Sequence, residues 1–559
     1  MYTFKKLVPS VLATMLMASV SFAPLASAED QVENNTENQA IKEIVQTNSR
    51  AAAYEVSATE QTTVTTAAYK QQLPANVMHE YLFTSSGGSF TVKANHQDPE
   101  ENIEYLIYDF NTEEVIEPTT SNSFNLVEGV YILLVMNIGD VTQGYDYSLD
   151  GPFKDQPDTE LPDLQVTSPT QASTRLPYGS ASEFTVNGTS TGTNVKLLVN
   201  GEEVDLVAPG AFSYKVNLEN GINDIMVRTM KAGGNSVTSH HEVTLPGVTR
   251  IIGSNRYEVS SNISATLDYW GGNSGTVIIA RGDMFPDALA GGPLAATEGA
   301  PILLTGTKSL PVAVQEEIQA LGAERAIILG GTGSVSTAVE EELADLGVTE
   351  IERIAGKDRF AVAAGVAEQV SAAWESDTAI IASGMVFPDA LSASGIAGVA
   401  GMPILPVKSD SVPDAIQNFI ADHPEIENFI VVGGPATVKA SVLAKIDEIT
   451  DGNAYIERIS GKDRYEVAIN VAKFGLEYFD LDLSTVTVAR GDLFPDALSG
   501  APLANYFNAP ILLTSTSKLE DKVNTFLTSQ KGKMDHIYIL GGTGSVSINT
   551  ENQLKGLLQ

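Results

Sequence analysis

A block with two arginines recurs three times in the second half of the chain. Each copy reads Arg-x-x-Gly-x-x-Arg, and the arginine pairs are Arg250 and Arg256, Arg353 and Arg359, and Arg458 and Arg464. The second and third copies add a lysine after the glycine, Lys357 and Lys462. A guanidinium group pairs bidentately with phosphate or carboxylate, so a repeated pair of such groups suits a repeating anionic polymer. Salt bridges between neighbouring copies explain the arginines equally well, and both interpretations stay open.

A second block, Phe-Pro-Asp-Ala-Leu, places one aspartate in each copy: Asp287, Asp389 and Asp496. The aspartate stands where a helix N-cap belongs, and its carboxylate can accept hydrogen bonds from the free N–H groups of the first turn. We expect it to cap a helix, with ligand contact as the alternative. Arg281 and Arg490, which follow apolar runs shortly before two of these blocks, are further candidates for contact with an anionic polymer.

Each copy also ends an apolar run with a Gly-Gly pair, as in Gly330-Gly331. Exposed backbone N–H groups near a helix start can bind an anion, but a tight strand-to-helix turn explains the pair as well. No pair is followed by the Gly-Lys-Ser/Thr of a nucleotide-binding loop, so nucleotide binding is poorly supported.

The segments around these blocks alternate between strand and helix patterns. Apolar runs of strand length, such as 276–280, 301–304 and 326–329, predict a parallel sheet buried on both faces. Helix-period segments lie between them, for example 287–297 and 311–321. This alternation predicts a doubly wound α/β layer, whose ligands usually meet the loops beyond the carboxyl ends of the strands. The copies begin at 250, 353 and 458, a spacing that fits whole domains rather than solenoid turns.

Four blocks, the fourth being Ala300-Pro301-Ile302 and its counterparts, keep one order in all three copies. They resemble the cell-wall-binding repeat type 2 family, which occurs in triplets on surface proteins of Gram-positive bacteria. The resemblance implies three Toprim-like α/β domains about a pseudo-threefold axis. It also implies non-covalent anchoring on an anionic, teichoic-acid-like wall polysaccharide. On this basis we place the repeats at 247–349, 350–454 and 455–559.

The part before residue 247 has a different texture. Lys5 and Lys6, a short apolar stretch and Ala26-Ser27-Ala28 predict a secretory signal peptide at 1–28. Polar residues predict a disordered leader at 29–76. Short β-rich runs then predict a β-sandwich at 77–152, a linker at 153–163 and a second β module at 164–246. The first module resembles the jelly-roll domains of secreted bacterial peptidases, and the second resembles immunoglobulin-like spacer domains of bacterial surface proteins. The expected architecture is thus β modules for display, followed by a wall-binding triplet.

The composition of the chain excludes some classes of binding partner. The net charge is −37, and the acidity is spread over both halves of the chain. Such a surface repels nucleic acid and anionic lipid, so we expect neither nucleic-acid binding nor membrane insertion once the signal peptide is removed. With no cysteine, the domains must be stable through core burial alone. We expect no cofactor, although a divalent cation could bridge the protein to an anionic polymer. Whether the protein is monomeric or assembles on the surface stays open.

Two other functions compete with anchoring. One is a structural surface-layer protein that assembles through the triplet. The other is an enzyme, either a cell-wall hydrolase or a Toprim-like metal enzyme. An enzyme is poorly supported, because no nucleophile pattern stands out and the second copy has Ser383-Gly384-Met385 where the first has Arg281-Gly282-Asp283. A catalytic metal site should not lose a ligand in one copy. We therefore predict a binding protein without catalytic activity.

Overall fold

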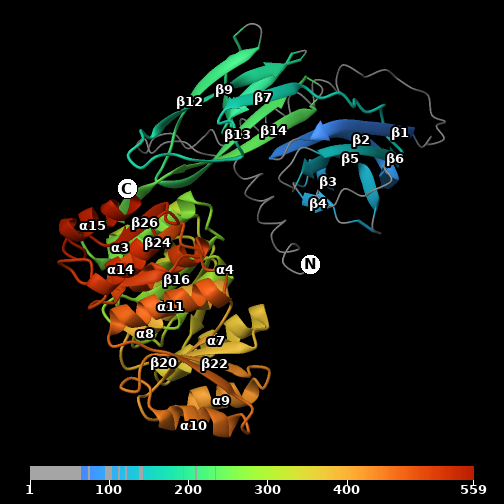
Figure 1. Cartoon of the computed structure of the whole chain (residues 1–559). Helices are drawn as coiled ribbons and strands as arrows, with labels where there is room; N and C mark the ends of the chain where they lie inside the picture. The colour runs from blue at the N-terminus through green and yellow to red at the C-terminus, as the bar shows by residue number, and fades with distance from the viewer. Residues whose placement is uncertain are drawn as a thin grey trace. The chain divides into compact units, whose positions relative to one another are not determined.

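The chain divides into two compact units in the computed structural model (Figure 1). The structure describes residues 65–559 except 74–75, 95–102, 111, 113, 117, 120–121, 138–142, 193, 208–209 and 233. Unit 1 comprises the described residues up to Leu176 together with Ser180–Thr244, and unit 2 comprises Pro177–Gly179 and Leu245–Gln559. The expected signal peptide and most of the expected leader lie outside the described residues. Among the described helices, none is long and apolar enough to cross a membrane.

Unit 1 is built of β-strands. They are β1 (Thr65–Leu73), β2 (Val77–Ala94), β3 (Ile103–Asp109), β4 (Glu114–Ile116), β5 (Ser123–Asn137), β6 (Gln143–Gly151), β7 (Asp163–Ser168), β8 (Ser173–Arg175), β9 (Glu183–Thr191), β10 (Lys196–Val199), β11 (Glu202–Glu203), β12 (Ala211–Asn217), β13 (Gly221–Met230) and β14 (Ser236–Leu245). Strands β7, β9 and β12 form one sheet, and the other eleven form a second. Tyr81, Phe83 and Phe90 of β2 are buried in the core, and the first two follow the alternation of a half-buried strand. The predicted β-rich character is confirmed.

The two expected β modules are not separated by a free linker. Strand β14 of the second pairs with β2 of the first, from Ser236–Glu80 to Ser239–Val77, so one sheet runs through both. The expected linker is hydrogen-bonded to the second module, because the Asn235 amide donates to the carbonyls of Asp158 and Glu160 at 2.9 Å. The predicted linker at 153–163 therefore does not separate two sheets. Strand patterns show which residues form strands but not which strand edges will pair.

Strand β1 lies inside the segment expected to be a disordered leader. It pairs with β6 from Thr65–Gly151 to Leu73–Gln143, and its Tyr69 and Leu73 are fully buried. The prediction of a leader at 29–76 is wrong for residues 65–73. Their few apolar side chains alternate with polar ones, which suits a strand against a preformed core better than it suits disorder.

Unit 2 contains three repeats with nearly the same order of elements. The first has β15 (Gly247–Ile251), α3 (Arg256–Tyr269), β16 (Thr276–Arg281), α4 (Gly291–Glu298), β17 (Ile302–Thr305), α5 (Val312–Ala320), β18 (Arg325–Leu329) and α6 (Thr337–Asp345). The second has β19 (Glu350–Ile354), α7 (Arg359–Trp374), β20 (Thr378–Ser383), α8 (Pro388–Val399), β21 (Ile404–Val407), α9 (Asp414–Asp422), β22 (Asn428–Val432) and α10 (Ala440–Ile449). The third has β23 (Tyr455–Ile459), α11 (Arg464–Tyr478), β24 (Thr485–Arg490), α12 (Pro495–Ser499), α13 (Ala501–Tyr506), β25 (Ile511–Thr514), α14 (Asp521–Ser529), β26 (His536–Leu540) and α15 (Ile548–Leu558). The predicted α/β repeats with parallel sheets are confirmed.

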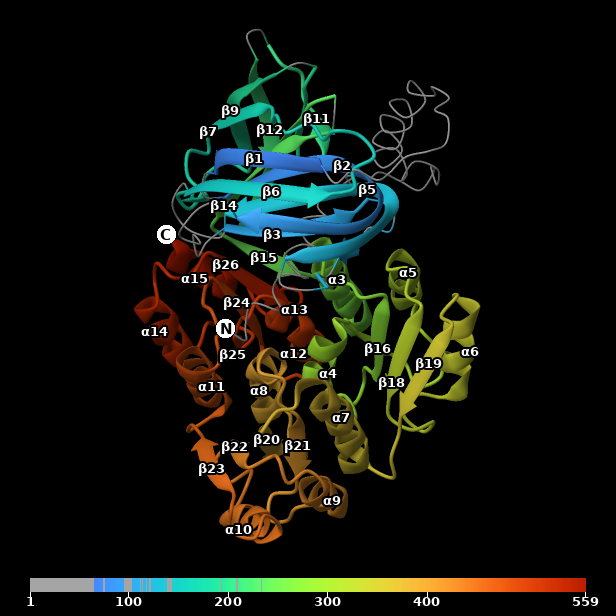
Figure 2. The same cartoon turned by 90° about the vertical axis from the view of Figure 1, so that its right-hand side faces the viewer.

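The first strand of each repeat completes the sheet of another repeat. Strand β19 pairs with β18 of the first repeat, and β23 pairs with β22 of the second. Strand β15, at the start of the triplet, pairs with β26 at its end, from Gly247–His536 to Ile251–Leu540. Each sheet therefore has four strands, of which one is borrowed, and the three repeats close into a ring (Figure 2). The sequence boundaries at 247, 350 and 455 mark the period but not the packed bodies.

The middle of unit 2 is formed by α4, α8 and the α12–α13 pair, which contact one another (Figure 2). Small residues allow this close approach. A Cβ on Gly292 would lie 2.8 Å from the Ser394 Cβ, and one on Gly398 would lie 2.1 Å from the Asn505 amide nitrogen. In α8 every residue from Pro388 to Gly398 is buried. Helix α8 is thus buried on nearly all sides between its neighbours, and the blocks that precede the central helices are held next to one another.

Candidate functional site

The second arginine of each Arg-x-x-Gly-x-x-Arg block is the first residue of a helix. Arg256, Arg359 and Arg464 open α3, α7 and α11, and the residue before each of them is the N-cap. Those caps are Asn255, Asp358 and Asp463, whose side chains accept from the N–H groups of the first turn. Each cap fixes the helix start. It therefore also fixes where the neighbouring guanidinium group lies.

One nitrogen of each guanidinium group is bonded within its own repeat. The Nη1 atoms of Arg256 and Arg359 each donate to a loop carbonyl at 2.7 Å, that of Gly282 and that of Gly384. Arg464 donates in the same way to Gly491. Within 250–559, which is fully described, the Nε and Nη2 groups of these three arginines have no hydrogen-bond partner in the protein; only the Nη1 atoms are bonded. Each arginine is thus oriented by one bond and keeps donors for a ligand.

The three phenylalanines of the Phe-Pro-Asp block form a cluster. Phe285, Phe387 and Phe494, one from each repeat, have ring centres 5.6, 5.6 and 5.9 Å apart, and each pair is inclined by 62°. Edge-to-face contacts of this kind are favourable between aromatic rings. Their equal geometry makes the cluster a local threefold centre of unit 2.

The guanidinium groups lie over these rings, each on the ring of a different repeat. Arg256 lies 5.9 Å from the centre of Phe494, and Arg359 lies 5.8 Å from that of Phe285. Arg464 lies 5.9 Å from the centre of Phe387. A cation over an aromatic face is attracted by the ring quadrupole. The three contacts link each repeat to the one before it in the ring and gather three cations around one aromatic centre.

The first arginine of each block has a different place. Arg250 and Arg353 are ion-paired with Glu551 and Glu340, at 2.8 and 2.7 Å. Arg458 donates to the carbonyls of Gly433 and Val438 at 2.6 and 3.0 Å. In every case the partner belongs to the preceding repeat of the ring. The side chains of Arg250 and Arg353 are only 10% and 14% exposed, so these residues join repeats rather than face a ligand.

The aspartates of the Phe-Pro-Asp block do not cap helices. The N-cap of α8 is Phe387, with no side-chain hydrogen bond, and Asp389 lies inside the first turn. Its carboxylate instead accepts from the Thr437 hydroxyl at 3.1 Å, in the loop after the Gly-Gly pair. Asp287 accepts from Ser334 in the same manner. The expectation of capping is therefore wrong. Helices α8 and α12 begin one residue earlier, at a proline, which is favoured in the first turn, and α4 begins only at Gly291.

Burial of these carboxyl groups raises the pKa of Asp389 and Asp496, although Thr437 and Ser545 donate to them and Arg464 and Arg256 lie near.

The contacts of these aspartates also explain the first glycine of each Gly-Gly pair. Gly330 has φ of +108°, and a Cβ there would lie 2.6 Å from Asp287 Oδ2. The second glycine behaves differently: around Gly434 nothing lies within 4 Å of an added Cβ, and its φ is not left-handed. The fold requires the first glycine of the pair and not the second.

A family model described as cell wall binding domain 2 (CWB2) matches 250–340, 353–443 and 458–551. The three repeats belong to this family. They make the protein a secreted protein of the cell wall or cell surface. In unit 1, residues 162–246 match the model of glucodextranase, domain B.

Two curated relatives come from Bacillus subtilis (strain 168). The chain is 32% identical over 308 residues to N-acetylmuramoyl-L-alanine amidase LytC, covering 55% of this chain and 58% of that protein. It is 31% identical over 322 residues to the amidase enhancer, covering 57% of this chain and 42% of that protein. The chain thus spans about half the length of these relatives. Cwp6 from Clostridium difficile shares the fold, with a TM-score of 0.54, 21% identity and coverage of 71% of this chain and 68% of that one.

Four other basic residues of the CWB2 repeats are candidates for contact with a polymer: the lysines are exposed, and the arginines are paired with nearby aspartates. Arg281 and Arg490 form two-point ion pairs with Asp283 and Asp492, two residues further on. Pairing with the guanidinium group lowers the pKa of both aspartates. Lys357 and Lys462 are exposed and lie in the loops that lead to Arg359 and Arg464. The lysines are therefore available to a ligand, whereas Arg281 and Arg490 must first give up a partner.

Sequence reasoning missed an apolar rim at this end of the CWB2 triplet. The residue before each clustered phenylalanine is a large apolar side chain that is exposed: Met284 at 45%, Val386 at 41% and Leu493 at 46%. Their recurrence immediately before the Phe-Pro-Asp block was the available signal. They surround a centre that already carries three cations and three rings.

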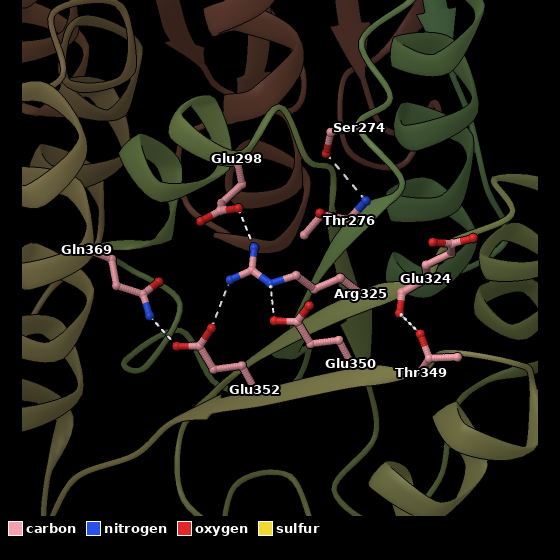
Figure 3. Close-up of polar contacts among 9 residues, drawn as sticks. All are labelled: Ser274, Thr276, Glu298, Glu324, Arg325, Thr349, Glu350, Glu352 and Gln369. Carbon is pink, nitrogen blue, oxygen red and sulfur yellow. Dashed lines mark hydrogen bonds and ion pairs between the residues drawn. The ribbon is translucent and has the colours of Figure 1, made fainter. Parts of the chain in front are cut away.

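The three junctions between CWB2 repeats are not chemically equivalent. At the first, the Arg325 guanidinium is surrounded by the carboxylates of Glu298, Glu350 and Glu352, while Gln369 of α7 donates to Glu352 (Figure 3). The equivalent position in the third repeat, at the start of β26, is His536, which bonds to Thr249 at 2.8 Å. These two junctions therefore have different polar partners.

Proposed function

We propose that the protein is anchored non-covalently to the cell wall through unit 2, which binds an anionic wall polysaccharide such as a teichoic-acid-like polymer. The observation that carries the proposal is the ring of Arg256, Arg359 and Arg464 around the phenylalanine cluster. Each guanidinium group is held over a ring, and its Nε and Nη2 donors remain unpaired. Such preoriented donors suit phosphate or carboxylate groups that recur along a polymer.

Several neighbouring groups support contact at the same end. Lys357 and Lys462 add exposed ammonium groups next to two of the three arginines. The second glycines, Gly331, Gly434 and Gly542, leave space that the fold itself does not use, so a polymer could approach the backbone closely. Arg281 and Arg490 would contribute by exchanging their aspartate partners for the polymer. A bridging divalent cation at Asp283 or Asp492 would serve the same purpose.

We propose a binding role without catalysis. Among the described residues, no three His, Cys, Asp or Glu side chains are grouped so that they could hold a metal ion. Asp389 is engaged in positioning a loop, as described above. The two relatives named as an amidase and an amidase enhancer match over a length close to that of the triplet, which is the binding part. In this proposal unit 1 is what the triplet displays at the wall.

Assembly into a surface layer is the second candidate, and the apolar rim of Met284, Val386 and Leu493 favours it, because exposed apolar patches often mark contacts between proteins. Size-exclusion chromatography with light scattering separates the two. An anchored protein elutes as a monomer, whereas a layer protein elutes as large assemblies.

The direct test is co-sedimentation of the protein with purified Gram-positive sacculi, before and after their anionic polymer has been stripped. We expect binding only to the unstripped sacculi. The variant Arg256→Gln/Arg359→Gln/Arg464→Gln should stay in the supernatant. The variant Arg281→Gln/Arg490→Gln should lose only part of its binding, because the three preoriented arginines remain. Equal binding to stripped sacculi would refute the anionic polymer as the ligand.

A further inference from the structure

The first helix of every CWB2 repeat begins with an arginine and ends with an aromatic residue. Helix α3 runs from Arg256 to Tyr269, α7 from Arg359 to Trp374 and α11 from Arg464 to Tyr478. At 1.5 Å rise per residue, the two ends of each helix are about 20 Å apart. Unit 2 therefore presents three aromatic positions at a distance from the three cationic ones.

These terminal aromatic side chains are exposed at all three positions. The exposed fractions are 44% for Tyr269, 37% for Trp374 and 60% for Tyr478. An isolated exposed aromatic residue needs no explanation. Each first helix ends in an aromatic residue whose ring reaches solvent, 13, 15 and 14 residues after its arginine. The three residues share the helix end rather than one helical face, and this recurrence at the end indicates a common use.

The rings are held in place rather than loosely exposed. Tyr269 packs edge-on against Trp270 with ring centres 5.2 Å apart, and Trp270 packs in the same way on Phe507 at 5.6 Å. The exposed Tyr506 continues this group: it packs on Phe507 at 5.1 Å and its hydroxyl donates to the Trp270 carbonyl.

The other two positions have their own supports. The Trp374 indole N–H donates to Thr297 of α4 at 2.9 Å, and its ring lies against Gly401, where an added Cβ would come within 2.2 Å of the indole. Tyr478 packs on Phe474, with ring centres 4.8 Å apart. A ring that is already ordered loses little conformational entropy when a ligand stacks on it.

From these observations we infer that Tyr269, Trp374 and Tyr478 are stacking platforms for the pyranose rings of the wall polysaccharide. A pyranose ring presents a face of C–H groups that packs on an aromatic ring, and this contact carries no net charge. That matters because residues 250–559 contain 21 Lys+Arg against 39 Asp+Glu, so an anionic chain is repelled away from the arginine ring. The inference rests on the proposed function. It adds contacts with neutral sugars of the same polysaccharide, at some distance along the polymer from the groups that contact the arginines.

The first test uses sacculus co-sedimentation of the full chain. Tyr269→Ala/Tyr478→Ala should bind about tenfold more weakly than the wild type. The control is Ile548→Ala, which removes an apolar side chain that is 52% exposed but lies on α15 and not at the end of a first helix; it should bind like the wild type. Unaltered melting temperatures will show that the variants are folded. If the double variant binds as tightly as the Ile548 variant, this inference is wrong and the proposed function survives. If the wild type itself does not bind sacculi, the proposed function fails and this inference with it.

The second test measures ligand binding at the platforms through tryptophan fluorescence. The chain has two tryptophans, Trp270 and Trp374; Trp374 is one of the three platforms, and Trp270 packs against another, Tyr269. Treatment of sacculi with hydrofluoric acid removes phosphodiesters and releases neutral oligosaccharides, which cannot use the arginines. Adding this fraction should change tryptophan emission in a saturable way, in the wild type and in Trp270→Phe, where only Trp374 reports. It should do so equally in the triple arginine variant. Absence of any emission change in the wild type would overturn the inference.

Discussion

The guanidinium carbon of Arg359 lies 5.8 Å from the ring centre of Phe285, and the two residues belong to different repeats. The contact recurs twice more around the ring, so each second arginine is both a link between repeats and a candidate ligand group. Stability and binding should therefore respond differently to its replacement, and this difference separates the two roles.

Single replacements should weaken unit 2 only mildly. Arg359→Ala removes one cation–π contact and one hydrogen bond to a carbonyl, at a combined cost of about 1–2 kcal/mol in unfolding free energy. Sacculus binding should fall only in part, because two equivalent groups remain. Combining the replacement with those of Arg256 and Arg464 should abolish binding while the far-ultraviolet circular dichroism spectrum is retained. A folded triple variant that binds normally would assign these arginines to packing alone.

The ring closure predicts that the triplet needs its first strand. A fragment that starts at 246 keeps β15, whereas one that starts at 253 loses it, and with it Arg250 and its ion pair to Glu551. The edge of β26 is then open, and open strand edges recruit other chains. We expect the shorter fragment to melt at a lower temperature and to form oligomers in light scattering. Two fragments of equal stability and size would show that β15 is dispensable.

Much of unit 2 can be predicted from the sequence, because its strands are continuous apolar runs and its blocks recur in order. The exchange of first strands cannot be predicted, since apolar residues such as Ile251 and Ile354 would be buried equally well in the sheet of their own repeat or in that of the preceding one. The phenylalanine cluster is also hidden: Phe285 and Phe387 are far apart in sequence, and only the ring brings them together. The failed N-cap at Asp389 was predictable, because the proline before it is favoured at the first helical position and so places Asp389 inside the helix.

In unit 1, Glu80 should be the residue whose loss is most damaging. It is 5% exposed, and its carboxylate accepts from Arg228, Ser236 and Thr238 across the joined sheet. Glu80→Ala leaves the Arg228 guanidinium largely buried without its anion, which costs about 3 kcal/mol or more. Differential scanning calorimetry should show one transition for unit 1 in the wild type and a markedly lower one in the variant. The control Glu183→Gln breaks an exposed pair with Lys215 and should leave the transition in place.

Acid should destabilise unit 2 through His536. This side chain is almost fully buried, and burial lowers its pKa to about 3. In the unfolded chain its pKa is near 6.5, so below that pH the unfolded state takes up a proton that the folded state refuses. Stability is therefore lost as the pH falls below about 6.5, by about 2 kcal/mol at pH 5. Burial raises the pKa of Glu317 to about 7, so this group stabilises the folded state as the pH falls. It does so equally in the wild type and in a variant that lacks only His536. His536→Gln should flatten the dependence of melting temperature on pH between 7 and 5; an unchanged slope would assign the acid sensitivity elsewhere.

The last prediction concerns salt, because an acidic unit must hold an acidic polymer. Residues 250–559 carry 21 Lys+Arg and 39 Asp+Glu, so the long-range interaction with an anionic polymer is repulsive. Salt screens this repulsion over a Debye length of about 8 Å at physiological ionic strength, while close contacts between guanidinium and phosphate groups are screened less. Sacculus binding should therefore rise from very low salt to an optimum and then decline. A basic nucleic-acid binder, by contrast, loses affinity steadily as salt increases.

The triple arginine variant provides the control, since it should show no optimum because it lacks the close contacts. A chelator added at the optimum tests cation bridging: if Asp283 and Asp492 bind the polymer through divalent ions, binding falls. A steady decline in wild-type binding from the lowest salt upward would contradict this account, because it would require a net attraction that the charges of unit 2 do not supply.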